Sequence, residues 1–330
     1  MMPSFAVIGS NSFSGASFAS TLLRQGYDVI GMSRSPEPHE VFLPYKWHSH
    51  GGRFTFHQID LNHDLEKADQ TLRRAKPSHI VNFAAQSMVG ESWKHPADWM
   101  MTNVVSTVRL HDVLRRYDWL DRYVHVTTPE VYGSTSDFIK EDTPFRPSTP
   151  YAVSRAAGDM SLRAYVEAFG LPAVATRAAN VYGPGQQLYR IIPRAIVCAL
   201  SGERLQLHGG GTSRRSFIHI DDVSSATLAI ALRAPIGETY HISTNEIVSI
   251  RELTERIYRR PDADFGGAID IVGERTGKDD AYLLDSGKLR SSLCWKDEIS
   301  LDAGLETCFA WVRQNRDVLA ALPNSYQHKP

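Results

Sequence analysis

The chain has few cysteines, and none is placed like a disulfide partner or a metal ligand. Its 330 residues include Cys198, Cys294 and Cys308, and no two of them form a CxxC pair. Unpaired cysteines of this kind are typical of a reducing compartment. We therefore expect no disulfide framework and no metal site.

Long apolar runs and an excess of one charge are also missing. No apolar stretch approaches the length of a membrane-spanning helix, and no basic leader precedes the first apolar run at Phe5. The 36 basic and 37 acidic residues leave a formal net charge of -1, without the basic excess of nucleic-acid-binding domains. We therefore expect a cytoplasmic protein that binds neither membranes nor nucleic acid.

What the sequence does contain is a regular alternation of short apolar runs with longer amphipathic segments. The short runs, which we interpret as strands, are Phe5–Ile8, Tyr27–Met32, Phe54–Gln58, Ile80–Phe83, Tyr123–Thr127 and Ala173–Arg177. The amphipathic segments, which we interpret as helices, are Phe13–Gln25, Leu65–Ala75, Trp99–Tyr117 and Tyr151–Phe169. Almost continuously apolar strands separated by helices predict an α/β fold with a doubly wound parallel sheet, the Rossmann architecture.

The alternation becomes irregular after Asn180, where shorter helices are separated by Gly- and Pro-rich connections. These helices are Ile191–Ser201, Ser249–Arg259 and Ile299–Asn315. We expect residues 1–180 to form the sheet domain and residues 181–330 mainly a smaller lobe over the carboxyl ends of the strands, where ligands bind. Ser216–Ile220 and Thr239–Ile242, within residues 216–245, are candidates for strands that return to the main sheet.

A glycine-containing turn, Gly9-Ser10-Asn11-Ser12-Phe13-Ser14-Gly15, connects the first strand to the first helix. Such a turn lets backbone N–H groups at the helix N-terminus face the pyrophosphate of a dinucleotide. The first and last glycines of that fingerprint are present, whereas Ser12 replaces the middle one. The context favours a cofactor site over an ordinary glycine-rich turn.

The end of the second strand bears on the choice of cofactor. An acidic residue there usually accepts hydrogen bonds from the ribose 2′-OH, but this chain has Ser33 and Arg34. A guanidinium beside hydroxyl groups suits a 2′-phosphate, so NADP is favoured, with NAD as the alternative. The other residues expected to contact the cofactor are Asp60 and Leu61 after the third strand, Phe83, Ala84 and Ala85 at the end of the fourth, and Tyr151 and Arg155.

Several further motifs occur in order along almost the whole chain. They are Asn82-Phe83-Ala84-Ala85-Gln86-Ser87, Thr102-Asn103, Thr127-Thr128-Pro129-Glu130-Val131-Tyr132-Gly133, Pro150-Tyr151-Ala152-Val153-Ser154, Asn180-Val181-Tyr182-Gly183-Pro184, Arg215-Ser216-Phe217-Ile218-His219 and Glu274-Arg275-Thr276-Gly277. With the glycine turn, they resemble the extended short-chain dehydrogenase/reductase family, and within it the nucleotide-sugar 4,6-dehydratases. Residues 85–89 and 91–93 most resemble the GDP-mannose 4,6-dehydratase branch. The resemblance implies that residues 1–180 bind NAD(P) and that the smaller lobe binds a nucleoside diphosphate sugar.

The resemblance assigns the first chemical step to Tyr151. In the family, a tyrosine at this position removes the proton of the sugar 4-OH while C4 gives a hydride to the nicotinamide. A phenol with a pKa of about 10 needs a nearby cation to act as a base. The family places a lysine four residues later, and this chain has Arg155. The guanidinium keeps the charge but not the shape of an ammonium, which puts the rate in doubt more than the fold.

The resemblance also gives roles to two residues after the fifth predicted strand. Thr128 matches the hydroxyl residue that hydrogen-bonds the 4-oxygen and the phenol, and Glu130 matches the acid/base that acts at C5 and C6. Some relatives have an aspartate between them, where this chain has Pro129, so Glu130 would also have to protonate the leaving water. A surface carboxylate with no catalytic role is the alternative for Glu130.

The remaining candidates bind substrate. Guanidinium groups bind phosphate oxygens in a forked geometry, and the family contacts the diphosphate through positions that match Arg215 and Arg275. The full set of expected substrate-binding residues is Gln86, Ser87, Asn180, Arg190, Arg194, Arg215 and Arg275. Arg190 and Arg194 could equally be surface charges of the lobe.

The family pairs the two helices predicted at 99–117 and 151–169 across a dimer, so a homodimer is expected. The predicted function is an NAD(P)-dependent nucleotide-sugar 4,6-dehydratase. A 4-epimerase, which would not need Glu130, and a uronate decarboxylase are the enzymatic alternatives. A non-catalytic sensor of cofactor or nucleotide sugar is the alternative from another class, because Ser12 and Arg155 depart from the family pattern.

Overall fold

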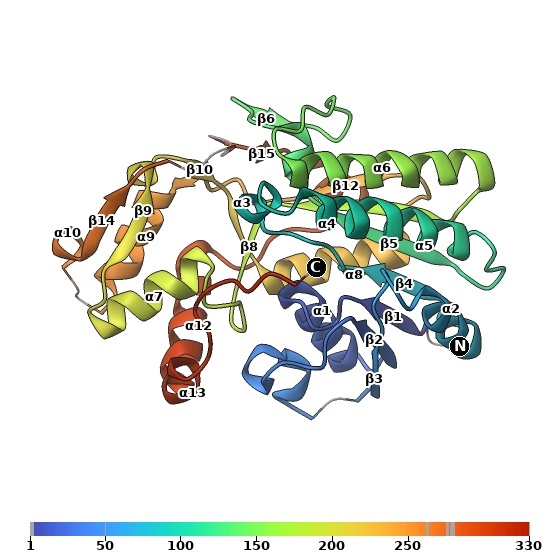
Figure 1. Cartoon of the computed structure of the whole chain (residues 1–330), viewed down its shortest axis with the longest axis horizontal. Coiled ribbons are helices and arrows are strands. Elements are labelled where there is room, and N and C mark those ends of the chain that lie inside the picture. The colour runs from blue at the N-terminus through green and yellow to red at the C-terminus, as the bar shows by residue number, and fades with distance from the viewer. Residues whose placement is uncertain (1–2, 50, 262–263, 275–276, 278–280, 330) are drawn as a thin grey trace.

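A seven-stranded parallel sheet forms the centre of the protein (Figure 1). The computed structural model describes residues 3–49, 51–261, 264–274, 277 and 281–329. The strand order is β12-β7-β5-β4-β1-β2-β3, and every neighbouring pair is parallel. The strands are β1 (Phe5–Ile8), β2 (Val29–Ser33), β3 (Phe54–Gln58), β4 (His79–Asn82), β5 (Arg122–Thr127), β7 (Ala173–Ala178) and β12 (Thr239–Ile242). The chain reverses direction across the sheet between β1 and β4, which is where such folds bind ligands. The predicted doubly wound fold is confirmed.

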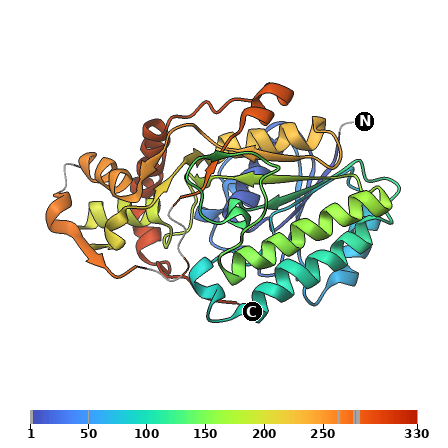
Figure 2. The ribbon, with the colours of Figure 1, turned by 90° about the horizontal axis from the view of Figure 1, so that it is seen from above.

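Helices cover both faces of the sheet, and each layer has its own apolar core. One face packs against α1 (Phe13–Arg24), α8 (Ile220–Arg233) and α11 (Gly287–Leu293). The other face packs against α2 (Leu65–Ala75), α5 (Thr107–Leu114) and α6 (Pro150–Phe169). Figure 2 shows α6 running beside the 96–114 helix. With both faces buried, the loops at the strand ends are the positions left to bind ligands.

The predicted helix Trp99–Tyr117 differs in detail from the observed one. It begins as α4 (Pro96–Met100), passes through a π-helical segment (Met101–Ser106) and continues as α5 to Leu114. Within the π segment, the buried Asn103 side chain donates to the Gln86 carbonyl oxygen at 3.0 Å and to the Ser154 hydroxyl at 2.9 Å. The wider helical turn therefore ties this helix to the end of β4 and to α6.

The second lobe is built from the later part of the chain around a separate apolar core. Its elements are α7 (Ile191–Ser201), β9 (Leu205–His208), α9 (Ile250–Arg259), α10 (Phe265–Ala268), β14 (Ile269–Val272), α12 (Leu301–Gln314) and α13 (Arg316–Ala320). Figure 1 shows this lobe beside the carboxyl-end edge of the sheet. A cleft between lobe and sheet is therefore the place to look for a site.

Short strand pairs connect the two parts. They are β8 (Asn180–Tyr182) with β11 (Phe217–His219), β10 (Arg214–Arg215) with β13 (Val248–Ser249), and β6 (Phe138–Ile139) with β15 (Leu283–Leu284). The segment Thr239–Ile242 returns to the main sheet as β12, beside β7. The segment Ser216–Ile220 does not join the main sheet, because β11 pairs with β8 instead.

No helix within the described part of the chain combines the length and the apolar character needed to cross a lipid bilayer.

Candidate functional site

A cavity of about 650 Å³ lies between the carboxyl ends of the main strands and the second lobe. It reaches from the N-terminus of α1 to the start of α7, and the fold brings most of the predicted site residues to its wall. Those that line it are Ser12, Phe13, Ser14, Phe83, Ala85, Ser87, Thr128, Glu130, Tyr151, Arg155, Asn180, Arg190, Arg194 and Arg215.

The glycine turn explains why Ser12 is compatible with a dinucleotide site. Gly9 has φ +82°, and a Cβ there would lie 2.7 Å from the Ala84 nitrogen. A Cβ on Gly15 would press against the Gly9 carbonyl oxygen. Ser12, in contrast, has φ −73° and caps α1, since its hydroxyl accepts a hydrogen bond from the Gly15 N–H at 3.1 Å. The two glycines that the geometry requires are present, and the third position does not need one.

The N-terminus of α1 suits an anion. Its first turn carries no acidic side chain, and the helix macrodipole places partial positive charge there. Together with the close approach of Gly9 to Ala84, these features fit the pyrophosphate of a dinucleotide. The Asn11 N–H donates to the Ser33 hydroxyl at 2.9 Å, which joins the turn to the end of β2.

The other predicted cofactor residues surround this turn without lining the cavity. Arg34 directly follows β2, and Leu61 and Ala84 pack against the core on the α2 side of the sheet. Asp60 follows β3, and its Oδ1 accepts a hydrogen bond from the Asn62 N–H at 2.9 Å.

Tyr151 is in the first turn of α6 and is almost fully buried beside the cavity. The helix starts here because Thr149 caps it, with its hydroxyl accepting from the Ala152 N–H at 3.1 Å, and Pro150 takes the first helical position. Burial raises the pKa of the Tyr151 phenol, the Arg155 charge lowers it, and Glu130 raises it again. A hydrogen bond with Thr128 lowers it. The four predicted catalytic side chains therefore act on one another.

Arg155 lies one helical turn after Tyr151 and is only 2% exposed. Its Nη2 donates to the Val126 carbonyl oxygen of β5, which fixes the guanidinium beneath the strand end. Its Nε is buried and has no hydrogen-bond partner among the described residues.

Glu130 is held in a 3₁₀ turn (Pro129–Tyr132) directly after β5. Thr128 caps this turn by accepting from the Glu130 N–H at 3.3 Å, and Pro129 occupies its first position. The Glu130 carboxylate lines the cavity and is close enough to Tyr151 and Tyr282 to raise the pKa of both phenols, which burial also raises. Pro129 therefore occupies the first position of the 3₁₀ turn, and the turn places Glu130 on the cavity wall.

Tyr282 is a site residue that the sequence reasoning missed. Its hydroxyl donates to the Asn180 Oδ1 at 2.6 Å, and its ring lies 4.5 Å from the guanidinium carbon of Arg215. It follows the Glu274–Gly277 motif closely in sequence, which is the one signal that could have drawn attention to it. The phenol positions one predicted substrate residue and stacks on another.

The predicted substrate residues differ in their relation to the cavity. Five of them line it, namely Ser87, Asn180, Arg190, Arg194 and Arg215. Arg190 is the N-cap residue of α7, and its Nη2 donates to the Ser87 hydroxyl at 3.5 Å. Gln86 is buried but does not line the cavity, and its Nε2 donates to the Lys329 carbonyl oxygen at 2.6 Å. Arg275 lies outside the described residues.

A family model described as GDP-mannose 4,6 dehydratase matches residues 7–308. The chain belongs to the GDP-mannose 4,6-dehydratase family. The predictions of fold, of family and of enzyme class, a nucleotide-sugar dehydratase, are confirmed.

Similar curated proteins are named for dTDP-glucose, whereas the family model is named for GDP-mannose. A dTDP-glucose 4,6-dehydratase of Mycobacterium tuberculosis (strain H37Rv) is 36% identical over 261 residues, which are 76% of each chain. A dTDP-glucose 4,6-dehydratase of Xanthomonas campestris is 30% identical over 356 aligned positions, covering 99% of this chain and 98% of the relative. Family membership therefore leaves the nucleobase open.

Two solved structures show the same fold. The dTDP-glucose 4,6-dehydratase DesIV from Streptomyces venezuelae, a double mutant with NAD and DAU bound, is 31% identical with a TM-score of 0.88, covering 95% of this chain and 98% of its own. A UDP-glucuronic acid 4-epimerase from Bacillus cereus, with UDP-glucuronic acid and NAD bound, is 26% identical with a TM-score of 0.85, covering 94% and 99%. Dehydratases and epimerases thus share this architecture, and the side chains at the reacting carbon must distinguish them.

Proposed function

We propose that the chain dehydrates a nucleoside diphosphate sugar across C5 and C6, with Tyr151, Thr128, Glu130 and Arg155 as catalytic residues. The observation that carries the proposal is their convergence on one cavity wall. A bound nicotinamide would supply the hydride chemistry, taking a hydride from C4 and returning it to C6 while C5 takes up a proton. The product is a 4-keto-6-deoxy sugar, and the cofactor is restored in each turnover.

Tyr151 and Arg155 carry out the first proton transfer. The phenolate of Tyr151 removes the proton of the sugar 4-OH, and the Thr128 hydroxyl holds the 4-oxygen. Arg155 stabilises the phenolate, because its charge is buried one helical turn away.

Glu130 carries out the elimination. The C4 ketone acidifies the C5 proton, the Glu130 carboxylate removes it, and the same group protonates the departing 6-hydroxyl. Pro129 offers no proton, so a single carboxyl group serves both purposes. An epimerase needs no group of this kind, and the position of Glu130 on the cavity wall favours dehydration.

NADP is the proposed cofactor, and NAD is the alternative. Ser33 ends β2, no acidic side chain follows before Glu37, and Arg34 is the next residue. The solved relatives bind NAD, so the two dinucleotides must be compared directly.

The diphosphate is proposed to bind where the second lobe faces the sheet. Arg215, held by the Tyr282 ring, and Arg190 and Arg194, at the start of α7, bring three guanidinium groups to one cavity. Arg275 is a further proposed contact, as implied by the family pattern.

A homodimer is proposed through the helices that cover one face of the sheet. Met101, Val153 and Met160 are exposed apolar side chains on the 96–114 helix and on α6. Size-exclusion chromatography with light scattering should give twice the 36.9 kDa chain mass, and a monomer would reject this part of the proposal. The three unpaired cysteines favour a cytoplasmic location, which we also propose.

One incubation tests the activity. The purified protein is incubated with NADP or NAD and a panel of nucleotide sugars, and the masses of the products are measured by mass spectrometry. A product lighter by one water is expected. An isomer of equal mass would identify an epimerase, loss of carbon dioxide would identify a uronate decarboxylase, and binding without turnover would identify a sensor.

A further inference from the structure

The segment 322–329 leaves the second lobe after α13 and runs back across the sheet domain. In Figure 1 it is the dark red trace that ends at the label C, in front of the sheet. We call this segment the strap. The strap contacts four parts of the protein that are far apart in sequence. They are Tyr189, the segment after β4, the region of α3 (Val89–Ser92) and α4, and the segment after β2.

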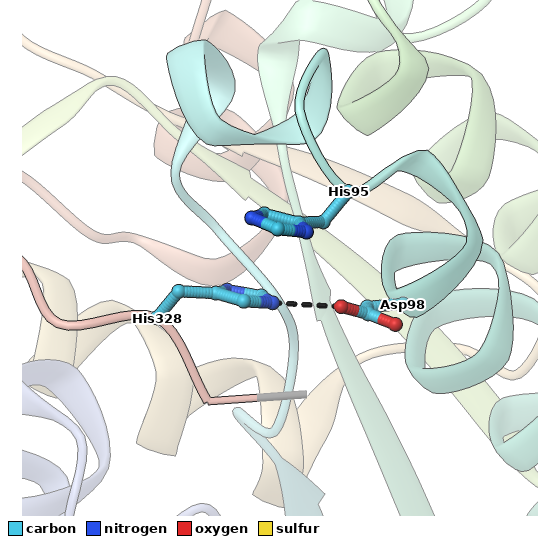
Figure 3. A group of neighbouring side chains, drawn as sticks. All are labelled: His95, Asp98 and His328. Atoms are coloured by element: carbon cyan, nitrogen blue, oxygen red, sulfur yellow. Dashed lines mark hydrogen bonds and ion pairs between the residues drawn. The ribbon is translucent and has the colours of Figure 1, made fainter.

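The strap is fixed to α4 by His328. Its Nε2 lies 2.7 Å from the Asp98 Oδ2, as Figure 3 shows. Its ring stacks on His95, with centroids 4.5 Å apart and planes 6° apart, and on the buried Trp99 at 5.2 Å. A hydrogen bond and two ring contacts at one residue can offset the cost of ordering a short segment. His328 therefore anchors the strap.

Lys329 then bridges two strand ends. Its carbonyl oxygen accepts from the Gln86 Nε2 at 2.6 Å, and its Nζ donates to the Ser35 hydroxyl at 3.2 Å. Gln86 follows β4 and Ser35 follows β2, while β1 lies between these two strands in the sheet. The turn after β1 is the glycine turn, so Lys329 crosses over the groove that begins at Gly9.

The strap also approaches Arg34. The Tyr326 phenol has a pKa raised by burial and lowered by the Arg34 charge, so the two side chains lie near each other. The Tyr326 ring packs on Tyr189 with centroids 5.6 Å apart, and its hydroxyl lies 3.5 Å from the Gln86 Oε1. The strap thus spans the mouth of the groove from the second lobe to the end of β2.

We propose that the strap covers the dinucleotide groove and that Lys329 is a cofactor-selecting residue, which binds the 2′-phosphate of NADP together with Arg34. The proposal rests on the proposed function, since it assumes a nicotinamide dinucleotide in this groove. NAD has no phosphate at that position, so the ammonium of Lys329 favours NADP over NAD.

The test measures binding of NADP and NAD by calorimetry, in buffer with EDTA because ligand atoms of His95, Asp98 and His328 lie within 4.8 Å of one another and could bind stray metal ions. Lys329→Met should weaken NADP binding about tenfold and change NAD binding by less than about twofold, since one charge contact is removed. Lys329→Arg should restore most of the affinity for NADP. Lys296→Met, at an exposed lysine outside the cavity, is the matched control and should bind both dinucleotides as the unchanged chain does.

Removal of residues 324–330 tests the strap as a cover. This shortened chain should bind both dinucleotides more weakly, with a larger loss for NADP, and its melting curve without ligand checks that it folds. Tighter binding after removal would show that the strap obstructs the groove and would overturn the proposal, as would unchanged affinities of Lys329→Met. If the unchanged chain binds neither dinucleotide, the proposed function itself fails.

Discussion

Replacement of Arg155 by glutamine tests how this enzyme makes its tyrosine basic. Burial raises the pKa of the Tyr151 phenol, and the Arg155 charge is the largest influence that lowers it. Glutamine removes the charge and keeps a neutral N–H group, but it is shorter than the guanidinium, whose Nη2 donates to the Val126 carbonyl oxygen. Comparison with Arg155→Lys, which keeps the charge, therefore separates the electrostatic role of Arg155 from the shape of its side chain.

The size of the effect follows from Coulomb's law. Side chains one helical turn apart are separated by about 5–6 Å, and two unit charges at that distance interact by about 3 kcal/mol at an effective dielectric constant of about 20. This corresponds to a pKa difference of about 2. At pH values below the pKa of the Tyr151 phenol in the unchanged chain, the fraction of phenolate and the rate of C4 oxidation should fall about 100-fold in Arg155→Gln.

The assay is a single-turnover measurement of cofactor reduction, followed by absorbance across a range of pH. The rising limb of the Arg155→Gln profile, which reports deprotonation of the Tyr151 phenol, should move to higher pH by about 2 units. Arg155→Lys keeps the charge and serves as the control, with a profile close to that of the unchanged chain. Identical profiles for Arg155→Gln and the unchanged chain would refute the reasoning, provided that both melt as cooperative folded proteins.

Three further predictions concern elimination, core stability and acid sensitivity. Glu130→Gln should still reduce the cofactor but lose about 10²–10⁴-fold in water elimination, seen by mass spectrometry as missing product; unimpaired elimination would rule out Glu130 as the acid/base. Asp159→Asn should lower the free energy of unfolding by about 3–5 kcal/mol in urea, because it leaves Arg177 buried without the carboxylate that lies 2.7 Å away; a loss below about 1 kcal/mol would contradict this. Burial lowers the pKa of His111 to about 4, so the unfolded chain binds an extra proton between about pH 6.5 and pH 4. Stability should fall by up to about 3 kcal/mol over that window, and His111→Asn should show a smaller fall in urea titrations at pH 7 and pH 5.

The local pattern of the sequence was enough to predict the central sheet. β1, β3 and α2 have the predicted bounds, since each is a short apolar run or a strongly amphipathic segment. The pairing of β11 could not be predicted, because its apolar run suits the main sheet and the β8 edge equally well. The π-helical segment at Met101–Ser106 also left no periodic signal, because its cause is a set of side-chain contacts with the end of β4 and with α6.

The candidate site likewise contains residues that could be predicted from sequence and residues that could not. Motifs that sit at strand ends, such as Thr128 and Glu130, could be placed from sequence because the fold brings all parallel strand ends to one edge. Tyr282 could not, since it reaches Asn180 across 102 positions of the chain and no spacing rule connects them. The contacts of the strap were even less accessible to sequence reasoning, because the hydrogen bond between Gln86 and Lys329 joins residues 243 positions apart.

Arg155 shows why a departure from a family pattern has to be judged in the structure. The i to i+4 spacing predicted that its charge would lie beside Tyr151, and the planar shape of the guanidinium put the rate in doubt, because the family has an ammonium there. The guanidinium instead has one nitrogen bonded to the Val126 carbonyl oxygen, while its Nε is buried without a hydrogen-bond partner in the described part of the chain. A longer, forked side chain can donate to β5 through one nitrogen and still hold its charge one helical turn from Tyr151, whereas a lysine at the same backbone position has a single nitrogen. The positive charge that the proposed chemistry needs is therefore retained, and the larger group is accommodated because the end of β5 supplies an acceptor for its extra donor.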